Sequence, residues 1–178
     1  MQVKLSQKEK MLLEDQKTHE EICIKKYNDY SNKASDPQLK QLFSNLAQQE
    51  EQHLNSINQI LSGQTPQMSQ QQSSQQQSQG QQMQQGMQNQ MQQKQTRQFS
   101  MLSNQQSNQT QMSNNEDAFL CNDMLNTEKY ISGSYDTTIF ECQDSNVRQV
   151  LNHIQKEEQQ HGEELFNYMT SHGMYQIQ

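Results

Sequence analysis

The apolar residues of this chain are concentrated at its two ends, where they recur at every third or fourth position. That period is typical of a helix with one buried face. It predicts helices over residues 6–33, 37–62, 115–142 and 145–172, with a long polar stretch between the second and the third. The core is therefore expected to come from two helical pairs that lie far apart in the sequence.

Local signals at the helix ends agree with these boundaries. Asp36 can cap the second helix, and either Asp144 or Ser145 can cap the fourth, because short polar side chains accept hydrogen bonds from the first turn. Gly63 and Gly173 follow the second and fourth helices and suit their ends. Each pair is therefore predicted to form a hairpin with a short turn.

The two pairs match each other when 108 is added to the residue number. The matched positions are Glu20 with Glu128, Tyr27 with Tyr135, Leu46 with Ile154, Glu50 with Glu158, and His53 with His161. Self-similarity at a fixed offset indicates a duplicated hairpin, and two copies are too few for a solenoid. We therefore expect an all-α four-helix bundle built from two related hairpins.

A glutamate and a histidine, three residues apart, interrupt the apolar face of the second helix and again that of the fourth. The two faces read Leu39, Phe43, Leu46, Glu50, His53, Ile57, Ile60 and Val147, Leu151, Ile154, Glu158, His161, Leu165, Tyr168. Helical spacing turns both polar pairs toward the core. Buried polar groups are costly unless something compensates them, so a partner inside the bundle is expected.

Folding each hairpin at its turn places a second glutamate opposite the first. Glu20 falls opposite Glu50, and the 108-residue offset selects Glu128 as the partner of Glu158. Four carboxylates and two imidazoles would then meet inside the bundle. This set resembles the ligand pattern of ferritin-like di-iron and di-manganese bundles. In that pattern, two helices each supply one glutamate and the other two each supply Glu-x-x-His.

This pattern predicts a dinuclear iron or manganese site. Glu50 and Glu158 would bridge the two metals, Glu20 and Glu128 would be terminal ligands, and His53 and His161 would each give one nitrogen. The alternative is a metal-free hydrogen-bonded layer, because Glu-x-x-His arises easily in a chain rich in glutamate and glutamine.

Five residues near the predicted site are given other roles. Tyr27 and Tyr135 lie about two turns beyond the terminal glutamates, where core packing is favoured over a hydrogen bond to a ligand. Glu21, Glu51 and Glu157 lie one residue off the apolar faces and are expected to be solvated.

Residues 64–113 are dominated by glutamine, with serine, asparagine and six of the eleven methionines. So few apolar side chains cannot offset an ordering cost of about 1–2 kcal/mol per residue, so we expect this low-complexity tract to be disordered. It separates hairpin units at 1–63 and 114–178. A passive linker and a segment that self-associates through glutamine amides are equally compatible with this composition.

Charge and cysteine content narrow the possible partners. A net charge of −7, a pI near 5.2 and no basic cluster argue against nucleic acid or an anionic membrane as the partner. The sequence contains no run of about 18 apolar residues, so it predicts no membrane span, and residues 1–30 carry no signal-peptide pattern. Cys23, Cys121 and Cys142 are scattered and odd in number, which favours free thiols.

The C-terminal hairpin resembles the coat F domain of endospore-forming bacteria. The resemblance covers roughly 116–176 and is carried by "EKY", "NVRQVLNHIQKEEQQHGEELFNYM" and the "GMYQ" end. The first hairpin resembles this family less directly: it matches the second hairpin at the 108-residue offset and is similar to hairpins of the same ferritin-like fold. The resemblance implies a spore coat protein, made in the mother cell and assembled on the forespore surface, with other coat proteins or further copies of itself as partners.

Two classes of function follow. The first is a structural spore coat component whose bundle keeps a dinuclear metal site. A metal retained only because it stabilises the folded state is compatible with this class. The second is a dimetal oxidase, peroxidase or catalase-like enzyme acting on oxygen or peroxide. The sequence favours the structural class, leaves turnover undecided and assigns no catalytic residue.

Overall fold

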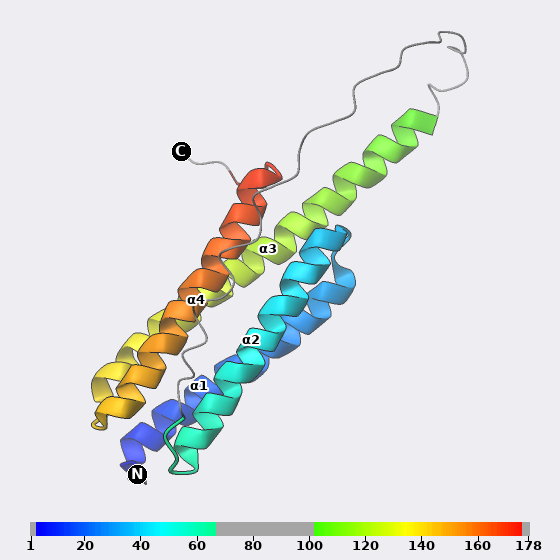
Figure 1. The fold of residues 1–178 in the computed structure, drawn as a ribbon. Coiled ribbons are helices and arrows are strands. Elements are labelled where there is room, and N and C mark those ends of the chain that lie inside the picture. The colour runs from blue at the N-terminus through cyan, green and yellow to red at the C-terminus, as the bar shows by residue number, and fades with distance from the viewer. Residues whose placement is uncertain (1–2, 67–101, 176–178) are drawn as a thin grey trace, which may run out of the picture.

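The computed structural model describes residues 3–66 and 102–175, with side chains described over 3–66 and 115–175. Four helices make up the fold: α1 (Gln7–Lys33), α2 (Pro37–Leu61), α3 (Leu102–Glu141) and α4 (Ser145–Ser171). α1 and α2 form one antiparallel hairpin, α3 and α4 form the other, and the two pack into a single bundle (Figure 1). The described residues contain no strand, so the predicted all-α four-helix fold is confirmed.

The helix ends are set by the residues that the sequence suggested. The Asp36 side chain accepts a hydrogen bond from a backbone N–H in the first turn of α2, and Asp144 accepts two in α4. Gly63 and Gly173 follow α2 and α4 with φ angles of 84° and 68°. Those angles lie in the left-handed region that glycine adopts without steric cost, so both helices stop there.

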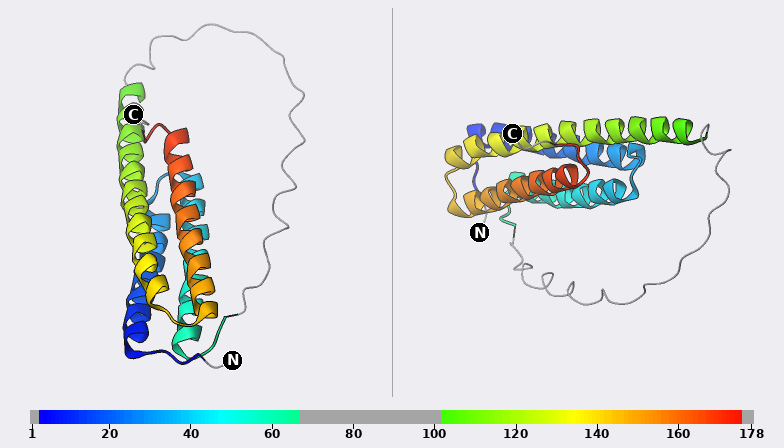
Figure 2. Two further views of the ribbon diagram at one scale, coloured as in Figure 1. Left: turned by 90° about the vertical axis from the view of Figure 1, so that its left-hand side faces the viewer. Right: turned by 90° about the horizontal axis from the view of Figure 1, so that it is seen from above.

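The third helix begins earlier than predicted. It starts at Leu102 rather than near 115, so residues 102–113, which we expected to be disordered, have helical backbone. Glutamine is a good helix former, and adding turns to a helix already held by packing costs far less than starting one. Figure 2 shows this part of α3 reaching past the α1–α2 turn. The rest of the disorder prediction, residues 67–101, lies outside the described residues.

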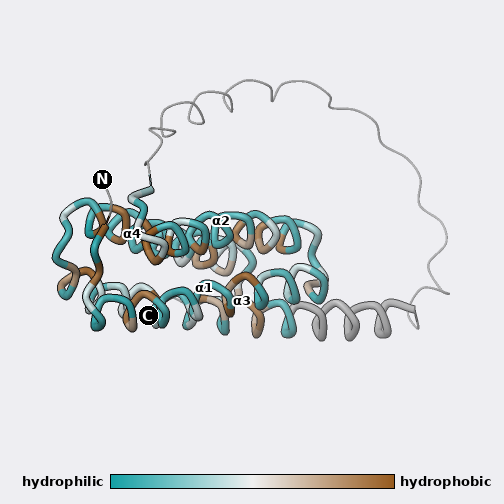
Figure 3. The backbone as a smooth tube through the Cα atoms, turned by 90° about the horizontal axis from the view of Figure 1, so that it is seen from below, coloured by the Kyte–Doolittle hydropathy of each residue, from teal (hydrophilic) through white to brown (hydrophobic). Residues whose placement is uncertain are grey.

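The predicted inward faces of α2 and α4 are buried throughout. Their members are Leu39, Phe43, Leu46, Glu50, His53, Ile57 and Ile60 on α2, and Val147, Leu151, Ile154, Glu158, His161, Leu165 and Tyr168 on α4. Figure 3 shows hydrophobic and hydrophilic positions alternating along the turns of these helices. A polar layer that contains both histidines interrupts these apolar faces at mid-height, and a second buried polar contact joins Gln16 to Thr138.

The three cysteines and the helix hydropathy match the sequence analysis. Cys23, Cys121 and Cys142 are buried free thiols. None of the helices in the described part of the chain combines the length and apolar character needed to cross a bilayer.

Each hairpin supplies a carboxylate that binds the turn of the other hairpin. Glu9 of α1 accepts a hydrogen bond of 2.8 Å from the backbone N–H of Gln143 in the α3–α4 turn. Asp117 of α3 accepts bonds of 2.7 and 3.0 Å from the N–H groups of Ser35 and Asp36 in the α1–α2 turn. Glu9 and Asp117 are related by the 108-residue offset, so the bundle has approximate two-fold symmetry.

Candidate metal centre

The structure brings all six predicted site residues together in the middle of the bundle. They form two groups, Glu20, Glu50, His53, Glu158 and Glu50, Glu128, Glu158, His161, and the candidate ligand atoms of each group lie within 4.8 Å of one another. None of the six is more than 3% exposed. Glu50 and Glu158 belong to both groups, whereas Glu20 and Glu128 belong to one each. This division has the form expected of two bridging and two terminal carboxylates.

The two imidazoles are stacked with nearly parallel planes, and both contact the shared carboxylates. Their ring centroids are 5.5 Å apart and their planes differ by 18°. His53 Nδ1 lies 2.9 Å from Glu158 Oε1 and 3.2 Å from Glu50 Oε2, while His161 Nδ1 lies 3.1 Å from Glu50 Oε1. The same nitrogen of each ring therefore faces the carboxylates.

The opposite nitrogen of each ring donates a hydrogen bond to the other hairpin. His53 Nε2 donates to Glu157 Oε2 at 3.0 Å, and His161 Nε2 donates to Gln49 Oε1 at 3.2 Å. An N–H fixed at Nε2 leaves Nδ1 of the neutral ring free to bind a metal, and such partners commonly orient metal-binding histidines.

Gln49 and Glu157 are the functional positions that sequence reasoning missed. We expected Glu157 to be solvated, and this was wrong: its side chain is 28% exposed and lies against His53. The two positions are related by the 108-residue offset, and each directly precedes an inward glutamate. That repeat was the available signal. One member of the pair is a carboxylate and the other an amide, so the two halves of the site differ here.

Tyr27 and Tyr135 contact the terminal carboxylates directly. The Tyr27 hydroxyl donates to Glu128 Oε1, and the Tyr135 hydroxyl donates to Glu20 Oε1. The sequence analysis favoured core packing alone for these tyrosines, which was incomplete. Both rings are fully buried, and a buried phenol needs a hydrogen-bond acceptor. Each tyrosine crosses from its own hairpin to the other, so the pair ties α1 to α3 at the site.

Burial favours the protonated form of three of the carboxylates, Glu20, Glu128 and Glu158, in the metal-free protein. It raises the pKa of Glu20 to about 7, with the neighbouring Glu50 adding to the effect. Burial and the charge of Glu50 likewise raise the pKa of Glu158 to about 7. The pKa of Glu128 lies well above its usual value, because of burial and the nearby Glu158. Cations bound in the site would lower these pKa values, so metal binding would release the protons.

The two histidines respond in opposite directions. Burial acts to lower the pKa of His53, but hydrogen bonds to surrounding carboxylates, Glu157 first among them, raise it well above its usual value. Burial lowers the pKa of His161. The amide of Gln49, which carries no charge, cannot reverse that effect. The residues at positions 49 and 157 thus contribute to the electrostatic difference between the two halves, together with the hydrogen bonds of His53 to the other carboxylates and the effect of the His53 charge on His161.

The carboxylate oxygens of the cluster fit a dinuclear metal centre. Glu20 Oε2, Glu128 Oε2 and both oxygens of Glu158 are buried without a hydrogen-bond partner in the described part of the chain. The approach of His53 Nδ1 to Glu158 lacks the alignment of a hydrogen bond. Four carboxylates would offset the charge of two divalent cations, and mixed oxygen and imidazole ligation suits iron and manganese.

A cavity of about 520 Å³ lies between α3 and α4 and reaches this cluster. Glu128 and Glu158 form part of its wall, together with Leu125, Ser132 and Gly162. Two carboxylates of the site thus adjoin a space large enough for a small molecule.

A bundle of four helices with carboxylates and imidazoles at its centre belongs to the ferritin-like class. The rubrerythrin family model matches residues 11–109, which is more than half of the chain, and the chain therefore belongs to the rubrerythrin family. The Coat F domain model matches residues 116–178. Searches of curated proteins and of solved structures found no match.

The two family matches confirm the resemblance on which the sequence analysis relied. The Coat F match covers α4 and the part of α3 that packs in the bundle, and the rubrerythrin match covers α2 and most of α1. The matched segments carry different halves of the candidate metal cluster.

Proposed function

We propose that this protein is a structural component of the bacterial endospore coat whose bundle holds a dinuclear iron or manganese centre. The Coat F match over residues 116–178 supports the coat assignment. The rubrerythrin match and the cluster of six buried side chains support the metal centre. Other spore coat proteins or further copies of this chain would be its partners.

The six residues would divide the ligation between two metal ions. Glu50 and Glu158 would bind both, since each belongs to both groups. Glu20 and His53 would complete one metal site, and Glu128 and His161 would complete the other. Iron or manganese held there would supply redox chemistry toward oxygen or peroxide.

Residues around the cluster would hold it in shape. Tyr27 and Tyr135 each occupy one oxygen of a terminal carboxylate, which leaves Oε2 of Glu128 and Oε2 of Glu20 for the metals. Glu157 holds the His53 ring with Nδ1 inward, and the surrounding apolar layers exclude water. Such fixed partners reduce the cost of organising ligands when a metal binds.

One observation carries the proposal: four buried carboxylate oxygens, on Glu20, Glu128 and Glu158, have no partner in the described part of the chain. A purely hydrogen-bonded layer would be expected to satisfy them, because an unpaired buried polar atom costs about 1–3 kcal/mol. Two cations would satisfy all four at once.

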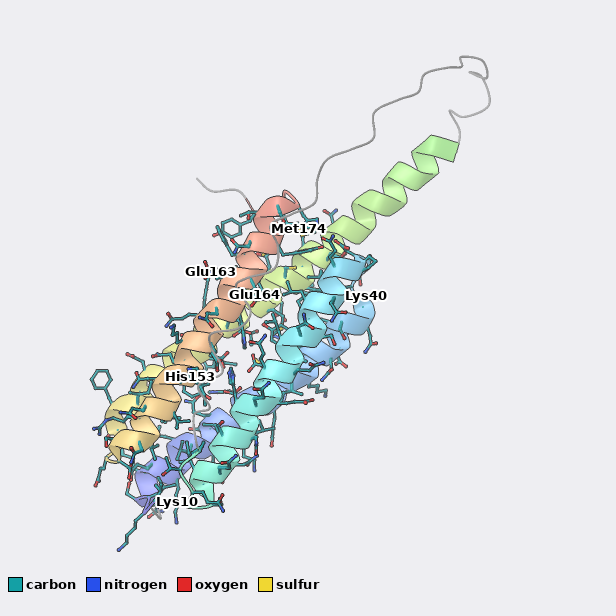
Figure 4. All side chains as sticks on the ribbon, in the orientation of Figure 1. Lys10, Lys40, His153, Glu163, Glu164 and Met174 are labelled. Carbon is teal, nitrogen blue, oxygen red and sulfur yellow. The ribbon has the colours of Figure 1, made fainter. Side chains whose placement is uncertain are left out.

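Metal analysis of the purified protein by plasma mass spectrometry tests the centre. We expect about two equivalents of iron or manganese in the parent chain and loss of most of it in a Glu50→Ala, Glu158→Ala double variant. The matched control is Glu51→Ala with Glu163→Ala, which removes exposed carboxylates from the same two helices. Figure 4 labels Glu163 on α4, outside the bundle interior. A folded parent that binds no metal from iron- or manganese-containing buffer would refute the centre.

The coat assignment has its own test. A fluorescent fusion expressed during sporulation should form a ring on the forespore surface, and the protein should appear in coat extracts of purified spores. Cross-linking of those extracts would identify neighbouring coat proteins. Even distribution through the mother cell, with none in the coat fraction, would contradict the assignment.

A second candidate function is a dimetal oxidase or catalase-like enzyme acting on oxygen or peroxide. The cavity between α3 and α4 favours it, because a solute there would lie against Glu128 and Glu158. Peroxide consumption by metal-loaded parent, compared with the Glu50→Ala, Glu158→Ala variant, tests this activity. Equal rates in the two proteins would exclude it.

A further inference from the structure

The cavity between α3 and α4 lies next to two residues of the candidate metal cluster. Its inner wall includes Glu128 and Glu158, which are at most 2% exposed and have three carboxylate oxygens without a hydrogen-bond partner in the described residues. Its outer part is lined by Gly133, which is exposed, and by Ser132 and Gly162, which are partly exposed. The cavity therefore lies against the two buried glutamates, whose unpartnered carboxylate oxygens are closed to solvent in this conformation.

The other hairpin carries larger side chains at the equivalent positions. Subtracting 108 replaces Ser132 by Ile24, Gly133 by Lys25 and Gly162 by Leu54. The approximate two-fold symmetry places these residues beside Glu20 and Glu50, as their small counterparts lie beside Glu128 and Glu158. The site is thus flanked by small residues on the α3–α4 side and by bulky ones on the α1–α2 side.

Gly162 determines how much room remains near the carboxylates. A Cβ atom at this position would lie 3.7 Å from Leu125 Cδ1 and 3.9 Å from the Cβ of Glu128, which is ordinary van der Waals contact across to α3. Leu125 and Glu128 both line the cavity, so a longer side chain at this position would take up space beside them. On the facing helix, the Ser132 carbonyl accepts a hydrogen bond of 2.8 Å from Gln155 Nε2. That bond links α3 to α4 at the cavity wall.

The lining of the cavity offers oxygen ligands to a cation. Its wall includes three carboxylates, those of Glu128, Glu158 and Asp136, and one amine, that of Lys129. Asp136 and Lys129 are both exposed, so solvent weakens their influence, whereas the two glutamates are buried. The inner end is therefore formed by the carboxyl groups of Glu128 and Glu158, whose oxygens bind divalent cations when the cation displaces their protons.

We propose that the α3–α4 cavity is the route by which divalent cations enter the dinuclear site, with Gly162 and Ser132 keeping it open. This inference rests on the proposed metal centre. It assigns the two small residues a role in the rate of metal loading, which is separate from the affinity set by the six ligands.

Stopped-flow loading of the metal-free full-length protein with cobalt(II) tests the route. The variants Gly162→Leu and Ser132→Ile each install the residue found at the equivalent position of the first hairpin. We expect loading to be slower by about tenfold or more in each, with the final cobalt content unchanged, because the ligands remain while the path narrows. Asn167→Leu, at an exposed position of α4, is the matched control and should load at the parental rate.

The outcomes separate the route from the centre. Loading within twofold of the parental rate in Ser132→Ile and Gly162→Leu would overturn the route and leave the centre intact. If Gly162→Leu also lowers the final content, because it adjoins His161, then Ser132→Ile decides alone, since no candidate ligand lies within two residues of it. A parent chain that takes up no cobalt, iron or manganese would overturn the centre and the route together.

Discussion

The hydroxyl of Tyr27 donates a hydrogen bond to Glu128 across the bundle, from the first hairpin to the second. Tyr135 returns the same contact to Glu20. Each candidate terminal carboxylate is therefore positioned by the hairpin to which it does not belong. Packing of the two hairpins against each other is thus what brings the candidate ligands into place.

Replacing either tyrosine by phenylalanine should weaken metal binding without removing a ligand. We expect Tyr27→Phe and Tyr135→Phe each to lower affinity by about 10- to 100-fold, the range typical of residues that orient ligands. Competition titration with a chromophoric chelator measures this. Tyr130→Phe, at a 67% exposed position, is the control and should match the parent. Parental affinity in both inner variants would show that the hydroxyls do not position the carboxylates.

The metal-free protein should become less stable as pH rises from about 4.5 to about 7. Glu20 and Glu158 have pKa values raised by burial to about 7, against an ordinary 4.5, so the folded state binds protons more tightly than the unfolded chain. Their contribution is complete below pH 4.5 and is lost as pH passes through 7. His53 acts in the same direction, while His161, whose pKa is lowered, acts against it.

Thermal unfolding in chelator-containing buffers across this pH window measures the effect. Glu20→Gln should flatten the slope, whereas the exposed Glu21→Gln should leave it unchanged. Saturating metal should flatten or reverse the slope, because metal replaces the bound protons. A melting temperature of the metal-free protein that rises steadily between these pH values would contradict the prediction.

The two metal positions should differ in affinity, because Glu157 supports His53 whereas Gln49 supports His161. A carboxylate accepting the ring N–H makes the imidazole a better ligand than an amide does. Glu157→Gln should therefore bring the two dissociation constants together, and Gln49→Glu should do so by strengthening the weaker position. Calorimetric titration of the metal-free parent and both variants provides the comparison. Equal affinities in the parent would rule out the asymmetry.

Removal of the Asp117 carboxylate should destabilise the bundle far from the metal site. Asp117→Ala leaves the turn N–H groups of Ser35 and Asp36 without their acceptor, which should cost about 1–3 kcal/mol in the free energy of unfolding. The exposed neighbour Glu116→Ala should stay within about 0.5 kcal/mol of the parent. Urea denaturation of metal-free samples separates the two. Equal midpoints for both variants would contradict the role assigned to Asp117.

The inward faces and the six candidate ligands could be predicted because they depend on local geometry. Helical periodicity alone turned Glu50 and His53 toward the core, and the position of the turn placed Glu20 opposite Glu50. The 108-residue repeat then carried the same reasoning to the second hairpin. Each of these steps needed only neighbours on one helix or across one short turn.

Other features depended on how the hairpins meet, which no short turn specifies. The height of α1 relative to α3 decides that Tyr27 reaches Glu128, and these residues are 101 positions apart. The reach of Glu157 across to His53 depends on the same packing. No capping residue or hydrophobic periodicity in the sequence predicted the early start of α3 at Leu102.

The approximate two-fold symmetry resembles that of a homodimer whose subunits have been joined into one chain. In a true homodimer, the two metal positions would be identical, because any substitution would appear in both subunits. A single chain, in contrast, can carry glutamine at position 49 and glutamate at position 157, and can place small residues on one side of the cluster only. Covalent linkage of the repeats would thus permit two metal ions held in this cluster to differ in reduction potential and in exposure to solutes.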